Sequence, residues 1–133
     1  MPGVVVDTHT VVWFLSRDPQ LSTKARDLLR SATAAGEIIH VPSICLVELT
    51  YVIEKRRLPA AARERLVDAL DDPSNPCSLV PLDRLVADAL ERVPRSEVPD
   101  LPDCIIAATA IALQAPLIRR DGRIRASRVQ TIW

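Results

Sequence analysis

Apolar residues in this chain follow two patterns: short continuous runs, and longer stretches in which they recur every three to four positions. Continuous runs bounded by turn-forming residues are typical of buried strands in a parallel sheet. Recurrence every three to four positions places apolar side chains along one face of a helix. The runs predict strands at residues 4–6, 38–41, 78–80, 117–118 and 129–132.

The helical spacing predicts helices between these strands. We expect them at residues 10–16, 21–32, 44–56 and 103–114, with one more that Pro59 opens and another that Asp83 caps. Ser43 is a suitable N-cap for the helix that follows it. Strands that alternate with helices indicate an α/β fold, a three-layer sandwich with a central, mainly parallel sheet flanked by helices. We expect a single domain over residues 1–133.

The composition excludes several classes of protein. Apolar residues make up 48% of the chain, which is too high for a disordered protein. The longest apolar stretches are too short to span a membrane, and no basic-then-apolar signal segment opens the chain, so a cytoplasmic protein is expected. Cys45, Cys77 and Cys104 are odd in number and lack a CxxC pair, which argues against a disulfide scaffold or a zinc knuckle.

The formal net charge is zero, because 17 basic residues balance 17 acidic ones. This balance is unusual for a nucleic-acid-binding protein, which is typically basic. The charges are distributed unevenly, however, and residues 119–133 hold five arginines and one acidic residue. A basic C-terminal stretch can therefore coexist with an acidic site elsewhere in the chain.

Several acidic residues stand where strands end or helices begin, and ligands of parallel α/β sheets bind beyond the carboxyl ends of the strands. Asp7 and Asp121 each follow a predicted strand, and Asp103 begins a predicted helix. Glu48 lies in the apolar run ICLVELTYVI, where an ionised carboxylate needs a charged partner or a metal ion. Each residue taken singly also has an ordinary explanation, such as a turn, a helix N-terminus or a salt bridge.

Clustered together, these carboxylates would repel one another, and their pKa values would rise. A divalent cation removes that conflict, and Mg²⁺ and Mn²⁺ prefer such oxygen ligands. The sequence therefore predicts a metal-dependent phosphoryl-transfer site.

Other catalytic motifs are weaker. His9 and His40 lack a partner at the spacing of a zinc site, and the sequence has no glycine-rich phosphate-binding motif. The DTH at residues 7–9 resembles the start of haloacid dehalogenase-like phosphatases, which have a second Asp where His9 stands. We expect Trp13 and Phe14 to pack in the core or an interface rather than to stack on bases.

Four sequence blocks resemble the PIN-domain family, and within it the VapC-type toxins of bacterial toxin–antitoxin modules. The blocks are VVVDTHTVVWFL, VPSICLVEL, DLPDCIIAATA and LIRRDGRI, in the family's order, and the closing VQTIW is also typical. The resemblance covers essentially the whole chain. It places the catalytic acids at Asp7, Glu48, Asp103 and Asp121.

The resemblance implies a Mg²⁺- or Mn²⁺-dependent endoribonuclease toxin, inhibited by a cognate VapB-type antitoxin and forming a homodimer within the toxin–antitoxin complex. It implies that Asp7 and Asp103 bind the metal ion. Glu48 and Asp121 would bind it directly or through water.

Substrate and partner contacts are also expected along the chain. The candidates for substrate contacts are Thr8, Arg119, Arg120 and Arg123. Thr8 is also a candidate to donate a hydrogen bond near Asp7, and the arginines are candidates to contact either RNA phosphates or an acidic tail of the antitoxin. The apolar helical faces at residues 46–53 and 66–70 are candidates for a surface that docks the antitoxin.

Two positions depart from the family pattern. Arg119 stands where the family often has Ser or Thr, two residues before the fourth acid, and Cys104 replaces the common Arg after the third acid. These departures motivate an alternative hypothesis, a non-catalytic PIN-like module that binds RNA or protein. A small-molecule phosphatase of haloacid dehalogenase type is a third hypothesis.

Overall fold

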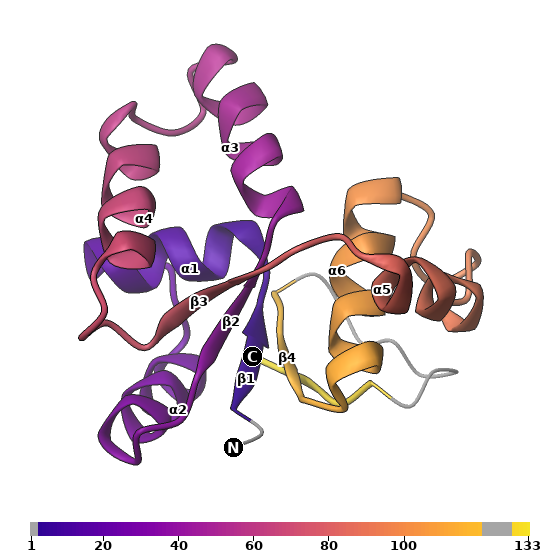
Figure 1. Ribbon diagram of the computed structural model, residues 1–133. Coiled ribbons are helices and arrows are strands. Elements are labelled where there is room, and N and C mark those ends of the chain that lie inside the picture. The colour runs from indigo at the N-terminus through magenta and orange to yellow at the C-terminus, as the bar shows by residue number, and fades with distance from the viewer. Residues whose placement is uncertain (1–2, 121–128) are drawn as a thin grey trace.

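The computed structural model describes residues 3–120 and 129–133, in which five parallel strands form one sheet (Figure 1). The strand order is β3-β2-β1-β4-β5. The strands are β1 (Val4–Val6), β2 (Ile39–Pro42), β3 (Cys77–Val80), β4 (Leu117–Ile118) and β5 (Thr131–Ile132). The predicted strands and the parallel α/β fold class are confirmed, with small shifts at the strand ends.

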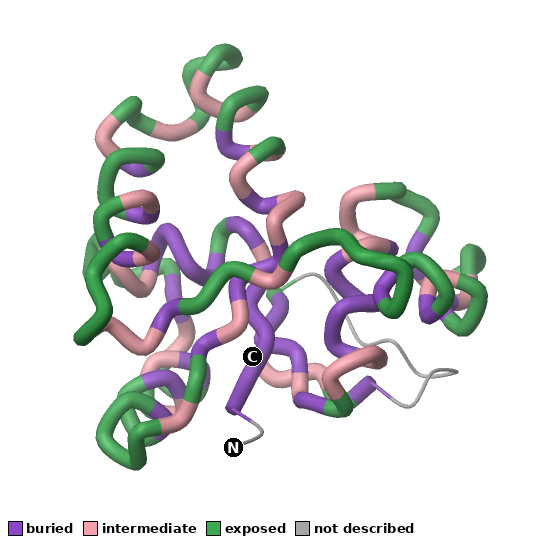
Figure 2. Tube along the Cα trace, in the orientation of Figure 1, coloured by how far each residue is buried: buried purple, intermediate pink, exposed green. Residues whose placement is uncertain are grey.

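The central strand, β1, is buried along its whole length (Figure 2). Gly3 leads into it with a φ of 64°, and a Cβ atom at this position would lie 2.0 Å from the carbonyl oxygen of Ile38. Glycine alone tolerates this approach, which brings the N–H of Val4 to 3.1 Å from the same carbonyl oxygen. The glycine therefore aligns β1 with β2.

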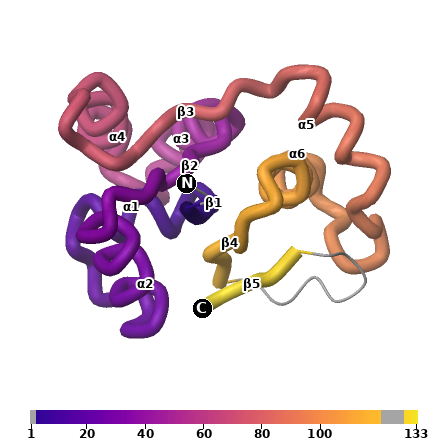
Figure 3. The backbone as a smooth tube through the Cα atoms, turned by 60° about the horizontal axis from the view of Figure 1, so that its bottom comes forward, coloured from indigo at the N-terminus to yellow at the C-terminus, as the bar shows by residue number. Residues whose placement is uncertain are grey.

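Helices cover both faces of the sheet (Figures 1 and 3). They are α1 (Thr8–Ser16), α2 (Thr23–Ala34), α3 (Ile44–Glu54), α4 (Ala61–Asp71), α5 (Arg84–Ala89), the 3₁₀ turn η1 (Leu90–Arg92) and α6 (Leu101–Leu113). Helices α1, α2 and α4 lie on one side, α5 and α6 lie on the other, and α3 rises from the carboxyl end of β2. The layered arrangement agrees with the predicted sandwich.

Of the two capping residues that the sequence predicted, one caps its helix and the other does not. The carboxylate of Asp83 caps α5 by accepting the N–H of Val86 at 3.1 Å, as predicted. Ser43 precedes α3 but makes no side-chain cap, so that prediction is wrong. Its backbone is already helical, with φ −59° and ψ −26°, whereas a capping side chain requires an extended backbone.

Helix α6 begins at Leu101, two residues before its predicted start. Pro102 lies in the first turn, where the N–H that proline lacks would have no helical partner, so the helix can include it. Asp103 is thereby placed inside the first turn of α6. Within the described residues, no helix is both long and apolar enough to cross a membrane.

Candidate functional site

Asp7 occupies the junction between the central strand and the first helix. Its backbone N–H donates to the carbonyl oxygen of Ile118 at 3.4 Å, next to the end of β4. Its Oδ1 accepts the N–H of Thr10 at 3.0 Å and so caps α1. Burial raises the pKa of Asp7 above its ordinary value, although the bonds from Thr10 and the charges of His9 and Arg119 oppose the rise. The carboxylate is therefore held in place and poorly solvated.

Glu48 reaches the same region from the middle of α3. Its Oε1 accepts a hydrogen bond of 2.7 Å from the hydroxyl of Thr8, the residue after Asp7. Burial raises the pKa of Glu48, and the carboxylates of Asp103, Asp100 and Asp7 raise it further, against the lowering effect of the Thr8 hydroxyl. Since these neighbours come from α6 and from the end of β1, three separated segments of the chain place acids at this site.

Asp103 is the acid contributed by the first turn of α6. Its Oδ2 lies 3.7 Å from Nη2 of Arg119, which follows β4. The Arg119 side chain is 9% exposed, whereas the Asp103 side chain is 36% exposed. The arginine that departs from the family pattern therefore points into the acidic cluster and partly neutralises it.

The thiol of Cys45 lies among the same acids. Burial raises its pKa to about 12, and the charges of Asp7, Glu48 and Asp103 add to the rise. A thiol of this pKa stays protonated near neutral pH, so Cys45 is no nucleophile. The charges of all three carboxylates act on this one buried thiol, which agrees with their convergence.

Two of the predicted site residues, Asp121 and Arg123, lie outside the described residues. Cys104 is buried and its Sγ lies 2.8 Å from the carbonyl oxygen of Val98, which agrees with a packing role. Thr8 is 4% exposed and bonds to Glu48, and Arg120 is exposed. Thr8 and Arg119 thus lie within the acidic cluster, and Arg120 lies at the surface.

The chemistry of the donor atoms fits a hard divalent cation. Asp7, Glu48 and Asp103 offer only carboxylate oxygens, and burial makes the ionised forms of the first two costly without a cation. Over residues 3–120 and 129–133, no group of three or more His, Cys, Asp or Glu side chains has the spacing of a complete metal site. Mg²⁺ typically takes one or two protein carboxylates and completes its shell with water and substrate oxygens, so a pair of these acids suffices.

A cavity of about 290 Å³ adjoins Asp7. Its walls include His9 and Trp13 of α1, Arg57 after α3 and Arg120 after β4. The sequence drew attention to His9 only in arguing against a zinc site and a haloacid dehalogenase-like site, and it gave no signal for Arg57. Arg57 reaches the cavity through the turn between α3 and α4, a placement that local sequence patterns do not encode.

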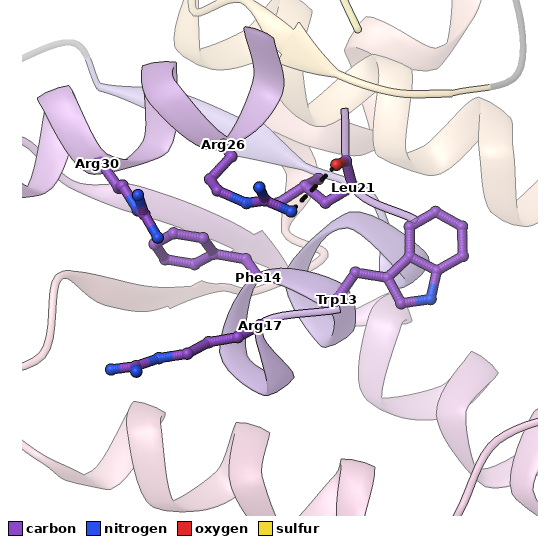
Figure 4. A pocket seen from close by; sticks show the side chains of 6 residues that line it. All are labelled: Trp13, Phe14, Arg17, Leu21, Arg26 and Arg30. Atoms are coloured by element: carbon purple, nitrogen blue, oxygen red, sulfur yellow. Dashed lines mark hydrogen bonds between the residues drawn. The ribbon is translucent and has the colours of Figure 1, made fainter. Parts of the chain in front are cut away.

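A second cavity, of about 300 Å³, is also lined by Trp13 (Figure 4). Arg17, Arg26 and Arg30 line it together with Phe14. Arg26 donates to the carbonyl oxygen of Leu21 at 3.4 Å, which fixes part of its wall. Trp13 itself is 5% exposed, so its predicted packing role is confirmed.

Comparisons with known proteins bear on the family and the fold. The family model described as PIN domain matches residues 4–129. A search of curated proteins gave no significant match.

Solved structures with the same fold include a chain of the Rickettsia felis VapBC2 complex bound to a DNA fragment from its promoter. That chain has a TM-score of 0.68 and 19% identity, over 96% of this chain and 97% of the other. A chain of a toxin–antitoxin complex from Klebsiella pneumoniae has a TM-score of 0.64 and 18% sequence identity, over 98% of this chain and 97% of the other. A chain of FitAcB from Neisseria gonorrhoeae has a TM-score of 0.63 and 22% sequence identity, over 96% of this chain and 95% of the other.

Proposed function

Since this chain belongs to the PIN domain family, we propose that it is a divalent-metal-dependent endoribonuclease and the toxin of a VapBC-type toxin–antitoxin pair. PIN domains are generally nucleases. The observation that carries the proposal is the convergence of three acids: Asp7 after β1, Glu48 in α3, which follows β2, and Asp103 at the start of α6. Ligands of parallel α/β sheets bind beyond the carboxyl ends of the strands, which is the end where these acids lie.

In the proposed site, Asp7 and Asp103 would hold Mg²⁺ or Mn²⁺. Glu48 and Asp121 would contribute directly or through water. Bound there, the ion would supply Lewis-acid activation of a water molecule and would neutralise charge that develops on the phosphodiester. The hydrogen bond from Thr8 orients Glu48, because a carboxylate with one oxygen engaged presents the other in a defined direction.

Arg119 serves as a cation within the acidic cluster. Its guanidinium is nearly buried and lies 3.7 Å from Asp103, and its charge also lowers the pKa of Asp7. We assign it the role of stabilising the acidic cluster before the metal binds. Arg120 is exposed, and with Arg123 it remains the candidate for contact with RNA.

The proposed partners are an antitoxin and a second copy of this chain, in the cytoplasm of a bacterium. The similar structures named above include toxin–antitoxin complexes. Helix α3 leaves Val47 52% and Tyr51 62% exposed, so the apolar face at residues 46–53 supports a docking role. The face at residues 66–70 gives weaker support, because Leu66 is fully buried in the core.

A non-catalytic PIN-like module is the second candidate. The ion pair between Arg119 and Asp103 favours it, because a built-in cation competes with a metal ion for that carboxylate. The two candidates differ in what they require of the acids. A catalytic toxin needs Asp7 and Asp103 ionised at a metal ion, whereas a binding module needs only the fold.

Expression in a bacterial host tests the proposal. The wild-type chain should arrest growth and fragment cellular RNA, and co-expression of the cognate antitoxin should relieve both effects. Asp103→Asn should not arrest growth at an equal protein level, because it removes the negative charge of one metal-binding carboxylate and keeps the shape of the side chain. Growth arrest by Asp103→Asn equal to that of the wild type would favour the binding module.

A further inference from the structure

The cavity beside Asp7 has the composition of a site for a planar, negatively charged ligand. The guanidinium carbon of Arg120 lies 5.6 Å from the centre of the Trp13 ring, and the His9 ring lies 5.3 Å from it at an interplanar angle of 50°. Trp13 is nearly buried, while His9 and Arg120 are exposed. Trp13 therefore forms the floor, and the imidazole of His9 and the guanidinium of Arg120 are two planar groups at the surface that a ligand can reach.

The cavity wall carries positive charge on two arginines and negative charge at Asp7. Arg57 and Arg120 supply positive charge, and the only acid that lines the described part of its wall is Asp7. A guanidinium binds phosphate oxygens and also stacks on nucleobases, whereas a carboxylate poised for a metal ion belongs at the scissile bond. The cavity thus places base-stacking and phosphate-binding groups directly next to the proposed reaction site.

The size of the cavity limits what enters it. At about 290 Å³ it lies just below the range of roughly 300–1,000 Å³ that is usual for small-molecule sites. One nucleotide unit suits this volume, and a duplex does not. Single-stranded RNA exposes its bases for stacking in this way, whereas base pairs keep them enclosed.

We propose that this cavity binds one nucleotide of single-stranded RNA, the one adjacent to the phosphodiester that is cleaved. The base stacks against Arg120 and His9 above the Trp13 floor, and Arg57 binds the neighbouring phosphate. This inference rests on the proposed ribonuclease function and adds a substrate subsite to it. His9, Arg57 and Arg120 then determine which RNA positions are cut.

Binding in the absence of metal tests the subsite separately from catalysis. The probe is a fluorescein-labelled single-stranded hexaribonucleotide of mixed sequence, titrated with protein in EDTA and followed by fluorescence anisotropy. The wild type should bind it, and Arg120→Ala and His9→Ala should each weaken binding about tenfold, as expected for loss of one stacking contact. Arg63→Ala is the matched control: Arg63 is an exposed arginine on α4 that does not line the cavity, and its loss should leave affinity unchanged.

Two further variants separate stacking from charge. Arg120→Lys keeps the positive charge and loses the planar group, so its affinity should stay weak while the salt dependence remains that of the wild type. Arg57→Ala should lower the slope of log K against log salt by roughly 0.7, the contribution of one phosphate contact on a single strand. All these residues are exposed, so an unchanged melting temperature should confirm folding.

Hexanucleotide affinity that is absent from the wild type, or unaffected by Arg120→Ala and His9→Ala, would overturn the inference. So would the finding that these variants lose affinity for an acidic peptide but not for RNA, which would assign the cavity to a protein partner. Cleavage of RNA by the wild type in Mn²⁺ is measured in parallel. If the protein binds RNA through this cavity but never cleaves it, the proposed ribonuclease activity is refuted and the RNA-binding role of the cavity stands. If the wild type cleaves RNA but the substitutions leave its affinity for RNA unchanged, only the proposed subsite is refuted.

Discussion

The hydroxyl of Thr8 donates a hydrogen bond of 2.7 Å to Oε1 of Glu48, joining two segments that lie 40 residues apart in the chain. Thr8 is buried, so this bond is protected from water. It links the residue after Asp7 to the acid on α3. The position of one proposed ligand is thereby coupled to that of another.

Removing this bond should reduce catalysis more than folding. Thr8→Val keeps the shape of the side chain and leaves Glu48 without its donor, which should raise the pKa of Glu48 further. We expect kcat for RNA cleavage to fall roughly 10- to 100-fold, the usual effect of losing a group that orients a metal ligand. The free energy of unfolding should fall by about 1 kcal/mol.

Thr8→Ser should restore most of the activity, since it restores the donor. Thr50→Val is the control, because the Thr50 hydroxyl is exposed and bonds only to the Leu46 carbonyl oxygen of its own helix. If Thr8→Val and Thr50→Val cleave RNA equally well, the positioning role of Thr8 is refuted.

Asp7 has a structural and a proposed catalytic role that substitution can separate. Asp7→Asn keeps an oxygen that can accept the Thr10 N–H, and it removes a carboxylate whose pKa is raised by burial. It should therefore abolish cleavage while leaving the metal-free protein at least as stable as the wild type near neutral pH. Asp7→Ala also loses the helix cap, which costs roughly 1 kcal/mol.

The control for capping alone is Asp83→Ala, which removes the equivalent cap of α5 at a residue that is not among the proposed metal-binding acids. It should lower the melting temperature and leave the rate of RNA cleavage unchanged. Equal loss of stability in Asp7→Asn and Asp7→Ala would contradict the assignment of a buried, unfavourable charge to Asp7.

The raised pKa values predict how stability depends on pH. Burial raises the pKa of Asp7 and Glu48 above 3.8 and 4.5, so between those values and the raised ones the folded protein holds protons that the unfolded chain releases. In EDTA, the free energy of unfolding should therefore decrease as pH rises through that window. At lower pH both states are protonated, and these two groups add no slope.

Urea unfolding from pH 4 to pH 7 measures this effect as the difference between the wild type and Glu48→Gln. The wild type should lose stability relative to Glu48→Gln as pH increases, and Mn²⁺ should reverse that loss because metal ligands bind in the deprotonated form. A pH-independent difference in EDTA would show that Glu48 titrates normally.

Sequence patterns predicted the parts of this molecule that depend on local burial. The apolar runs around β1 and β4 are buried at the centre of the sheet, and Asp7 follows β1 as expected. Glu48 was notable because an ionised carboxylate in an apolar run needs a charged partner or a metal ion, and the structure shows a neutral donor, the Thr8 hydroxyl, at 2.7 Å. Such positions are constrained by their own neighbours in the chain.

Contacts between distant segments were beyond the reach of the same patterns. The sequence indicated a hydrogen bond from Thr8 near Asp7 and substrate contact for Thr8 and Arg119, but it did not identify their partners in the structure, Glu48 and Asp103. The Arg57 wall of the cavity depends on how α3 packs, which no local spacing encodes. The false N-cap at Ser43 has a related cause, because the backbone angle at the junction of β2 and α3 is set by the sheet.

The internal cation gives a prediction of its own. Arg119→Gln removes the positive charge beside Asp103 while keeping a polar side chain, so the metal-free protein should be less stable because the carboxylates repel one another more strongly. The gain in melting temperature on adding Mn²⁺ should exceed that of the wild type, since the competing cation is gone. Thermal unfolding with and without Mn²⁺ measures both effects, and a smaller Mn²⁺ shift in Arg119→Gln than in the wild type would contradict this role.

The most direct test of the central claim is the cleavage of a single-stranded RNA of mixed sequence by purified protein, with Mn²⁺ or Mg²⁺ against EDTA. We expect cleavage by the wild type that requires the divalent ion, with Asp7→Asn and Asp103→Asn inactive and Arg63→Ala fully active from identical preparations. Cleavage that persists in EDTA, or that Asp7→Asn and Asp103→Asn carry out at the wild-type rate, would contradict a metal-dependent site built on these acids.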